Sequence, residues 1–199
     1  MNSPAVGIAG YMGSGKTTCC RLLANAGEFE IFDGDQEAKE IMNRNTVLKD
    51  KLVADFGADV VENNTISFKN LGAIVFRDIE KLHRLNAIVH PVLLERLHYT
   101  IFKKRSRVIV IDAALLPLWN IDEWFDLRLW VDASFTTRLG RLLQKAPGLG
   151  EEEIRRRMRI QESLVAIPSV RSWKHVLNEA EPEQVYERMR SWIQELSGA

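Results

Sequence analysis

The sequence GYMGSGKT, residues 10–17, matches the phosphate-loop pattern G-x-x-x-x-G-K-[ST] at every fixed position. The apolar stretch AVGIA, residues 5–9, precedes it, and a segment with helix-like spacing follows it. A loop in this context binds phosphate, because its glycines let backbone N–H groups converge on phosphate oxygens and the helix directs its positive end toward them. We therefore predict a strand–loop–helix corner that holds the phosphates of a nucleotide.

The residues of this loop have different expected tasks. Lys16 would place a charge at the β- and γ-phosphates, and the Thr17 hydroxyl would bind Mg²⁺. Asp112 ends the apolar stretch RVIVID and would lie near the same metal, although it could instead cap the turn that follows. ATP and Mg²⁺ are thus the predicted cofactors. The predicted nucleotide contacts around the loop are Gly10, Tyr11, Met12, Gly13, Ser14, Gly15, Lys16, Thr17 and Thr18.

Short apolar stretches alternate with helical patterns along the chain, which predicts an α/β fold. The stretches are rich in β-branched or aromatic residues, as buried strands are. We therefore predict a P-loop three-layer sandwich with a mainly parallel, five-stranded sheet. The predicted strands cover residues 5–9, 29–32, 107–112, 127–132 and 175–178.

Unequal spacing between these strands predicts two helical additions to the sheet. Residues 36–104 show helical apolar spacing and weak strand signals, which indicates a helical insertion at the carboxyl side of the sheet, where such folds bind ligands. Residues 138–165 carry Pro147 and Gly148 between two helical segments, a composition typical of a lid. The nucleotide-binding core then comprises residues 1–35 and 105–199.

Charge and composition limit the kinds of partner. Lys and Arg number 27, as do Asp and Glu, so no general basic field attracts nucleic acid. No apolar run reaches the length of a membrane span and the first residues lack a signal-peptide pattern, so we expect a cytoplasmic protein with no membrane partner. Cys19 and Cys20 are adjacent and are expected to be free thiols. We expect a monomer or a small homo-oligomer.

Two carboxylates indicate that the bound phosphate is transferred. The chain has no Asn-Lys-x-Asp guanine-binding motif, and a small core with a helical insertion and an Arg-rich lid is typical of small-molecule kinases. Asp33 follows the second strand and could deprotonate an attacking hydroxyl or hold the metal through water. Asp35 is then a helix cap or a substrate contact. The alternative is that one of the two aspartates acts only as a cap.

Further motifs follow the phosphate loop in a fixed order. DGDQEAKE occupies residues 33–40, and LGAIVF and IVHP occupy residues 71–76 and 88–91. DAALL, GLGEEE, RMRIQ and VLN follow at residues 112–116, 148–153, 157–161 and 176–178. With these motifs the chain resembles, over nearly its whole length, the dephospho-CoA kinase family, whose phosphate loop reads G-x-T-G-G-I-G-S-G-K-S.

The resemblance implies that ATP phosphorylates the ribose 3′-hydroxyl of dephospho-CoA, a small-molecule substrate, in the last step of coenzyme A synthesis. It implies Asp33 as the catalytic base, assisted by Lys16 and the lid residue Arg141. Residues 36–104 would bind the CoA portion and residues 138–165 would close over the nucleotide. The remaining implied contacts are Asn178 near the adenine, and Asp35, His90 and Arg157 on the substrate side. His90 could instead be a helix-boundary histidine before Pro91.

Several positions depart from the family pattern. The Asp-Arg pair that usually precedes L-G-x-I-V-F is Ser67-Phe68 here, so a cation that reaches the acceptor in the family is missing. Lys145 stands at the second lid arginine, which keeps the charge but loses the forked geometry. A kinase of another nucleotide or small alcohol, or an ATP-binding regulatory protein without transfer, remain the alternatives. Nucleic-acid binding through EIRRRMRI is disfavoured, because acidic residues flank this stretch.

Overall fold

The computed structural model describes residues 3–179 and 182–196, and its backbone contacts divide the chain into two compact units. The first, which we call the core unit, comprises Met1–Asp33 and Ile101–Ala199. The second, the inserted unit, comprises Gly34–Thr100. Each unit is described separately, and the last helix of the inserted unit continues two residues into the core unit.

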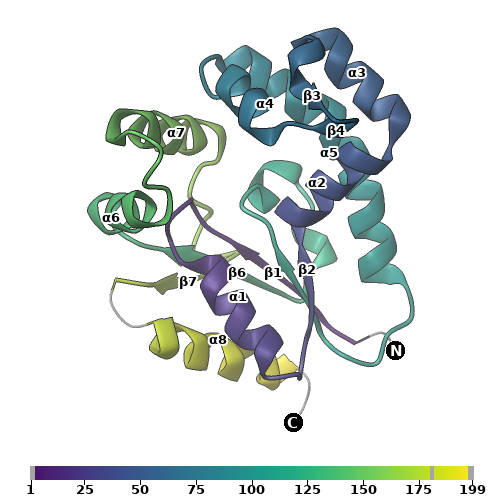
Figure 1. Cartoon of the computed structure of the whole chain (residues 1–199). Coiled ribbons are helices and arrows are strands. Elements are labelled where there is room, and N and C mark those ends of the chain that lie inside the picture. Colours follow the sequence, from purple (N-terminus) through teal and green to yellow (C-terminus); the bar gives the residue numbers. More distant parts are fainter. Residues whose placement is uncertain (1–2, 180–181, 197–199) are drawn as a thin grey trace. The chain divides into compact units, whose positions relative to one another are not determined.

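The core unit is built on a five-stranded parallel sheet in the order β2-β5-β1-β6-β7 (Figure 1). This confirms the predicted α/β fold and its five strands. Two strands have the predicted bounds, and the ends of the other three differ from the predicted ones by at most two residues, as is usual where hydrogen bonding fades. The strands are β1 (Ala5–Ala9), β2 (Glu30–Asp33), β5 (Ile109–Asp112), β6 (Leu127–Asp132) and β7 (Lys174–Leu177).

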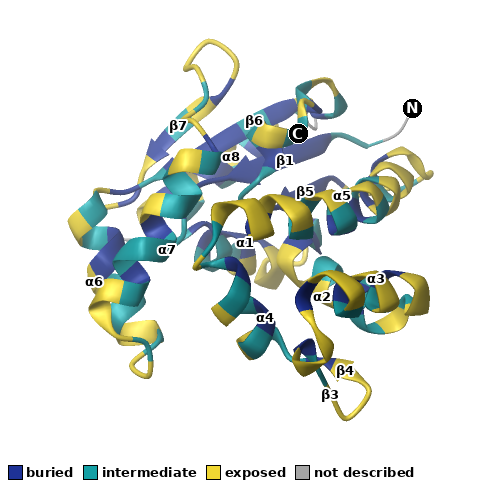
Figure 2. Ribbon diagram, turned by 90° about the horizontal axis from the view of Figure 1, so that it is seen from above, coloured by how far each residue is buried: buried dark blue, intermediate teal, exposed yellow. Residues whose placement is uncertain are grey.

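One face of this sheet is covered by α1 (Lys16–Asn25) and α8 (Pro182–Leu196). Alternate strand residues such as Val6, Ile8 and Val110 point to this face and are fully buried, because side chains alternate along a strand. The central strands are accordingly dark blue in Figure 2. On the other face Gly7 leaves room for Phe125, whose ring would lie 3.2 Å from an added Cβ.

Two helices of the core unit, α6 (Phe135–Lys145) and α7 (Glu151–Leu164), form a pair with its own small core. We call residues 135–164 the helical pair. Leu139, Ile154 and Met158 are buried between the two helices. Three glutamates occupy the first turn of α7, where their charge is favourable at the positive helix end. Short 3₁₀ turns, η2 (Leu116–Trp119) and η3 (Asp122–Trp124), connect β5 to β6.

The inserted unit is mainly helical, but it also contains a two-stranded hairpin that the sequence did not lead us to expect. Asn63 and Asn64 both adopt positive φ (49° and 61°), as the two central residues of a type I′ turn do. Each strand has only two residues, too few to show an alternating pattern. The elements are α2 (Gly34–Arg44), α3 (Thr46–Phe56), η1 (Ala58–Val60), β3 (Val61–Glu62), β4 (Thr65–Ile66), α4 (Phe68–Val75) and α5 (Ile79–Phe102).

Pro91 lies inside α5, a helix of 24 residues, rather than at a helix boundary. The alternative reading of His90 as a helix-boundary histidine is therefore wrong. A proline costs one backbone hydrogen bond, and a long helix with many apolar contacts tolerates that cost. Among the residues that the structure describes, no helix combines the length and apolar character needed to cross a bilayer.

Candidate active site

The phosphate loop joins the end of β1 to the start of α1 and has backbone geometry that only glycine accommodates readily. Gly13 and Gly15 have φ values of 80° and 92°. A Cβ on Gly15 would lie 2.2 Å from Nδ2 of Asn178. The Ser14 N–H donates to the Tyr11 carbonyl at 3.1 Å, which closes a tight turn. Because α1 begins at Lys16, the positive end of this helix adjoins the loop and favours an anion there.

Replacing Gly15 by alanine tests this geometry. We expect Gly15→Ala to lower affinity for ATP at least tenfold, because the methyl group must displace Asn178 and the loop backbone. Gly27→Ala is the matched control: Gly27 also has positive φ (72°) but no atom within 4 Å of the added Cβ. It should cost about 1–2 kcal/mol of unfolding free energy and leave ATP binding unchanged. Titration calorimetry measures the affinity for ATP, and denaturant unfolding measures the free energy of unfolding. Equal ATP affinity of the two variants would contradict the expectation.

Lys16 and Asp112 form a buried ion pair beneath the loop. The Lys16 ammonium donates to Oδ1 of Asp112 at 2.8 Å, and the two side chains are 9% and 3% exposed. The Thr17 hydroxyl lies 3.5 Å from the same ammonium. The predicted phosphate cation and the two predicted metal ligands thus lie together, in surroundings where electrostatic interactions are strong.

Asp33 lies next to Asp112 at the carboxyl edge of the sheet. The two residues are register partners in the parallel pair of β2 and β5. In-register neighbours point to the same face of a sheet, with their strands about 4.8 Å apart. Both follow by two residues a side chain that packs on the α1 face, Ile31 and Val110, so both carboxylates point toward the side where Lys16 lies. Asp112 is buried, whereas Asp33 is half-buried and accessible from solvent.

Arg141 and Asn178 reach the loop from the helical pair and from the end of β7. The Arg141 guanidinium donates to the carbonyls of Gly13 and Ser14 at 3.4 and 3.3 Å, and to Oδ1 of Asn178 at 3.4 Å. Asn178 in turn donates to the Ser14 carbonyl at 2.7 Å and is 1% exposed. Both residues therefore contact the backbone that surrounds the phosphate cradle.

The remaining predicted residues lie elsewhere. Arg157 is on α7, where it donates to Glu153 at 2.7 Å. Asp35 is an exposed residue in the first turn of α2, where its charge is favourable, and His90 is in the middle of α5; both belong to the inserted unit. Burial lowers the pKa of His90 to about 4, so its imidazole is neutral at pH 7.

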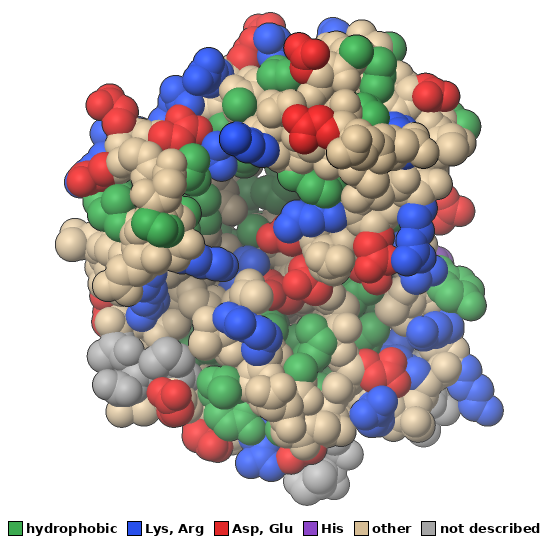
Figure 3. Space-filling model, viewed as in Figure 1, with side chains coloured by type: hydrophobic (Ala, Val, Ile, Leu, Met, Phe, Trp, Pro, Cys, Tyr) green, Lys and Arg blue, Asp and Glu red, His purple; other side chains and the backbone are tan. Residues whose placement is uncertain are grey.

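The arginine-rich stretch of α7 is neutralised by its own helix. Arg155 pairs with Glu151 at 2.7 Å, and Arg156 and Arg157 both pair with Glu153. Blue and red side chains accordingly lie side by side over α7 in Figure 3. Such pairing leaves little net charge for phosphate groups, which supports the expectation that this stretch is not a nucleic-acid interface.

Cys19 and Cys20 are free thiols in the structure, as predicted. Both are buried in α1, directly behind the loop. Burial raises the pKa of Cys19 to about 11 and that of Cys20 well above its usual value. The thiols are therefore protonated packing residues under ordinary conditions.

Sequence reasoning assigned no role to Arg138 and Gln161, although both contact the loop region. Arg138 is 4% exposed, and the Gln161 side chain accepts a hydrogen bond from the Met12 N–H. The signal for Gln161 was its place at the end of the RMRIQ motif, at a fixed spacing from the arginines. No local pattern distinguishes Arg138 from a surface helix residue.

Comparison with known proteins identifies the family. Residues 4–172 match the model of a family described as dephospho-CoA kinase. A dephospho-CoA kinase from Thermobifida fusca is 36% identical over 160 residues, which cover 79% of this chain and 79% of that protein. One from Chlorobium chlorochromatii is 32% identical over 203 residues, covering 96% and 92%.

Solved structures show the same fold at lower identity. TT1252 from Thermus thermophilus has a TM-score of 0.73 at 24% identity, covering 98% of this chain and 99% of that one. Dephospho-CoA kinase from Campylobacter jejuni has a TM-score of 0.65 at 20% identity, covering 100% and 98%. Shikimate kinase from Bacteroides thetaiotaomicron has a TM-score of 0.59 at 14% identity, covering 96% and 98%. At these identities the likeness concerns the fold alone.

Proposed function

The chain belongs to the dephospho-CoA kinase family, and we propose that it transfers the γ-phosphoryl group of ATP to the ribose 3′-hydroxyl of dephospho-CoA, giving coenzyme A and ADP. The observation that carries this proposal is the register pairing of Asp33 with Asp112, beside a phosphate loop whose lysine lies 2.8 Å from Asp112. A loop that only bound ATP would not need a second, accessible carboxylate at that edge.

ATP would lie with its phosphates on the amides of the loop and of the first turn of α1. Lys16 would exchange part of its contact with Asp112 for the β- and γ-phosphate oxygens. Thr17 and Asp112 provide a hydroxyl and a carboxylate, the oxygen ligands that Mg²⁺ prefers. The described residues contain no group of three or more His, Cys, Asp or Glu side chains that could hold a metal, so phosphate oxygens and water would complete the coordination of Mg²⁺. Bound there, the metal neutralises charge on the phosphates.

Asp33 would accept the proton of the attacking hydroxyl, or orient that hydroxyl, as phosphoryl transfer proceeds. Its half-buried position lets an acceptor approach. Arg141, held beside the loop carbonyls by the bonds described above, would stabilise charge on the transferred group. The helical pair would cover the nucleotide and exclude water. We further propose that the inserted unit binds the acceptor, with Asp35 and His90 among its contacts, and that Arg157 assists from the lid.

The substitution of Phe68 for the family's arginine has a counterpart within the inserted unit. The Lys39 ammonium of α2 lies over the Phe68 ring, 6.0 Å from its centroid. A lysine held over an aromatic face keeps its charge and is restricted in position. We propose that Lys39 supplies the acceptor-binding cation that position 68 no longer provides.

This proposal predicts a specific change in substrate affinity. Lys39→Met should raise KM for dephospho-CoA about tenfold and leave kcat nearly unchanged, because a charge-assisted hydrogen bond to the bound substrate is lost. Lys69→Met, at an exposed lysine next to Phe68, is the matched control and should behave as wild type. Steady-state kinetics with varied dephospho-CoA decide the point. Equal KM values for the two variants would remove Lys39 from acceptor binding.

A coupled assay of ADP release tests the proposed function itself. Dephospho-CoA, adenosine, AMP, pantetheine and shikimate are each supplied as the acceptor in a separate reaction with Mg²⁺-ATP. We expect release with dephospho-CoA alone, and mass spectrometry should find coenzyme A as the product. Release with another acceptor and none with dephospho-CoA would support a different small-molecule kinase. Tight ATP binding without turnover on any acceptor would support a regulatory ATP-binding protein.

A further inference from the structure

Tyr11, the first variable residue of the phosphate loop, does not point into the loop. Its side chain is 7% exposed, and its hydroxyl donates to the Val165 carbonyl at 2.6 Å. Its ring packs edge-on against Trp130 of β6, with centroids 5.0 Å apart and an interplanar angle of 87°. Val165 immediately follows the last residue of α7, so this bond joins the loop to the end of the helical pair.

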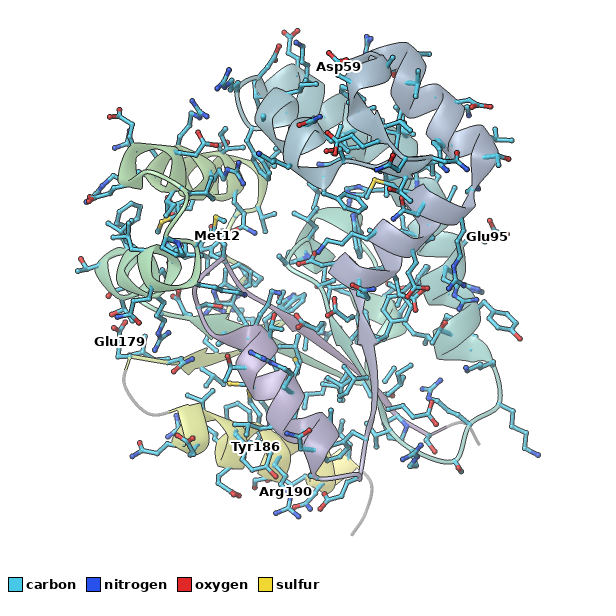
Figure 4. All side chains as sticks on the ribbon, in the orientation of Figure 1. Met12, Asp59, Glu95, Glu179, Tyr186 and Arg190 are labelled. Carbon is cyan, nitrogen blue, oxygen red and sulfur yellow. The ribbon has the colours of Figure 1, made fainter. Side chains whose placement is uncertain are left out.

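A second hydrogen bond joins the neighbouring residue to the same turn of α7. The Met12 N–H donates to Oε1 of Gln161 at 2.6 Å. Gln161 and Val165 are four residues apart, which places both on one side of the helix end. Figure 4 labels Met12 beside the helical pair, and its side chain packs against the small core there. Two successive loop residues therefore contact one turn of α7 through short, directional bonds.

Arg138 of α6 encloses this contact from the other side. Its guanidinium lies 5.0 Å from the centre of the Tyr11 ring, donates to the Ala133 carbonyl at 3.1 Å and pairs with Glu162 of α7. The backbone of Arg138 also touches Gly13, where an added Cβ would lie 2.7 Å from the Arg138 carbonyl oxygen. The loop is thus in contact with both helices of the pair.

The Tyr11 side chain contributes a specific hydrogen bond in addition to packing. A phenylalanine would fill the same space without donating to Val165. Burial, followed by the charge of Glu162, raises the pKa of Tyr11, so the phenol remains a donor at neutral pH. A glycine at this position could make neither the ring contact nor the hydroxyl bond.

We propose that Tyr11 and Gln161 form a latch between the phosphate loop and the end of α7, and that Tyr11 is a positioning residue for phosphoryl transfer in this chain. The latch would hold the helical pair over the loop, so that water is kept from the γ-phosphate while the acceptor hydroxyl attacks. Tyr11 acts through α7 and does not touch substrate. This inference rests on the proposed kinase function.

The test compares Tyr11→Phe with Tyr186→Phe, which removes a phenol from α8 (Figure 4). The measured quantity is the ratio of ATP hydrolysed by water to phosphate transferred to dephospho-CoA. We expect Tyr11→Phe to raise this ratio about fivefold to tenfold, as the loss of one buried hydrogen bond would, and Tyr186→Phe to leave it unchanged. Loss of folded protein alone would lower both reactions equally, so it would not move the ratio.

Hydrogen exchange of backbone amides tests the latch independently of phosphoryl transfer. Amides near residues 161–165 should exchange about fivefold to tenfold faster in Tyr11→Phe, while those of α8 keep their wild-type protection. If Tyr11→Phe does not fold, Gln161→Ala removes the second bond at a partly exposed residue and should change both readouts in the same direction. Wild-type exchange and a wild-type ratio in the folded variants would overturn the latch. If the wild-type protein transfers nothing to dephospho-CoA, but exchange near residues 161–165 is faster in Tyr11→Phe than in wild type, the kinase function is overturned and the latch stands.

Discussion

Asp33→Asn should lower kcat by about 10²-fold or more and leave the Kd for ATP within a few-fold of wild type. The amide has the shape of the carboxylate but cannot accept a proton from the attacking hydroxyl. The position of residue 33 is set by strand pairing with Asp112, which an amide does not disturb. ATP binding is expected to depend on the loop and on Lys16, which the substitution leaves intact. Turnover in the coupled assay and calorimetric titration with ATP measure the two quantities separately.

Asp35→Asn is the matched control, because Asp35 is also an aspartate at this junction but lies exposed in the first turn of α2. We expect its kcat to stay within a few-fold of wild type, with any change confined to KM for dephospho-CoA. If Asp33→Asn instead weakens the binding of Mg²⁺-ATP, Asp33 holds the metal through water rather than acting as the base. Unchanged turnover in Asp33→Asn would exclude both roles.

Lys16→Met should lower kcat by about 10³-fold and also weaken the fold. The ammonium is expected to balance charge that develops on the transferred phosphoryl group, and a methionine cannot. The substitution also leaves the Asp112 carboxylate, 3% exposed, without its cation. Removing one member of a buried ion pair typically costs about 3–5 kcal/mol of unfolding free energy. Denaturant unfolding and steady-state kinetics give the two effects independently.

The double variant Lys16→Met/Asp112→Asn separates these effects. Neutralising Asp112 removes the unpaired buried charge, so most of the lost stability should return while activity stays low. Lys103→Met, at an exposed lysine of the core unit, controls for loss of a positive charge and should match wild type in both measurements. Recovery of activity in the double variant would show that Lys16 acts only by supporting Asp112. An unstable double variant would show that the pair contributes through more than charge balance.

Three features were predictable because each depends on local sequence pattern. They are the phosphate loop, the five strands, and the family to which the chain belongs. The spacing of glycines indicates where the backbone needs positive φ, and runs of apolar residues indicate buried segments to within a few residues. The two carboxylates at strand ends were found by the same reasoning, since residues that end parallel strands meet at one sheet edge. The roles of the inserted unit and of the helical pair are still predictions that the proposed experiments address.

Local pattern was insufficient elsewhere. The 61–66 hairpin is too short to show alternation, and the alternative reading of His90 placed a helix boundary at Pro91, where the helix in fact continues. Lys39 and Phe68 meet across two helices, which no motif spacing records. At Pro91 the contacts of the surrounding helix outweigh the low helix propensity of proline.

By itself, the sequence predicted a glycine-rich corner suited to hold phosphates, and it placed Asp33 and Asp112 near strand ends. The tertiary structure alone decided which side chains surround that corner. Tyr11 and Val165 are 154 positions apart, and Asn178 and Ser14 are 164 apart. Contacts at such separations form only after the chain has closed around its core, because burial and the order of the strands select them and local propensity does not.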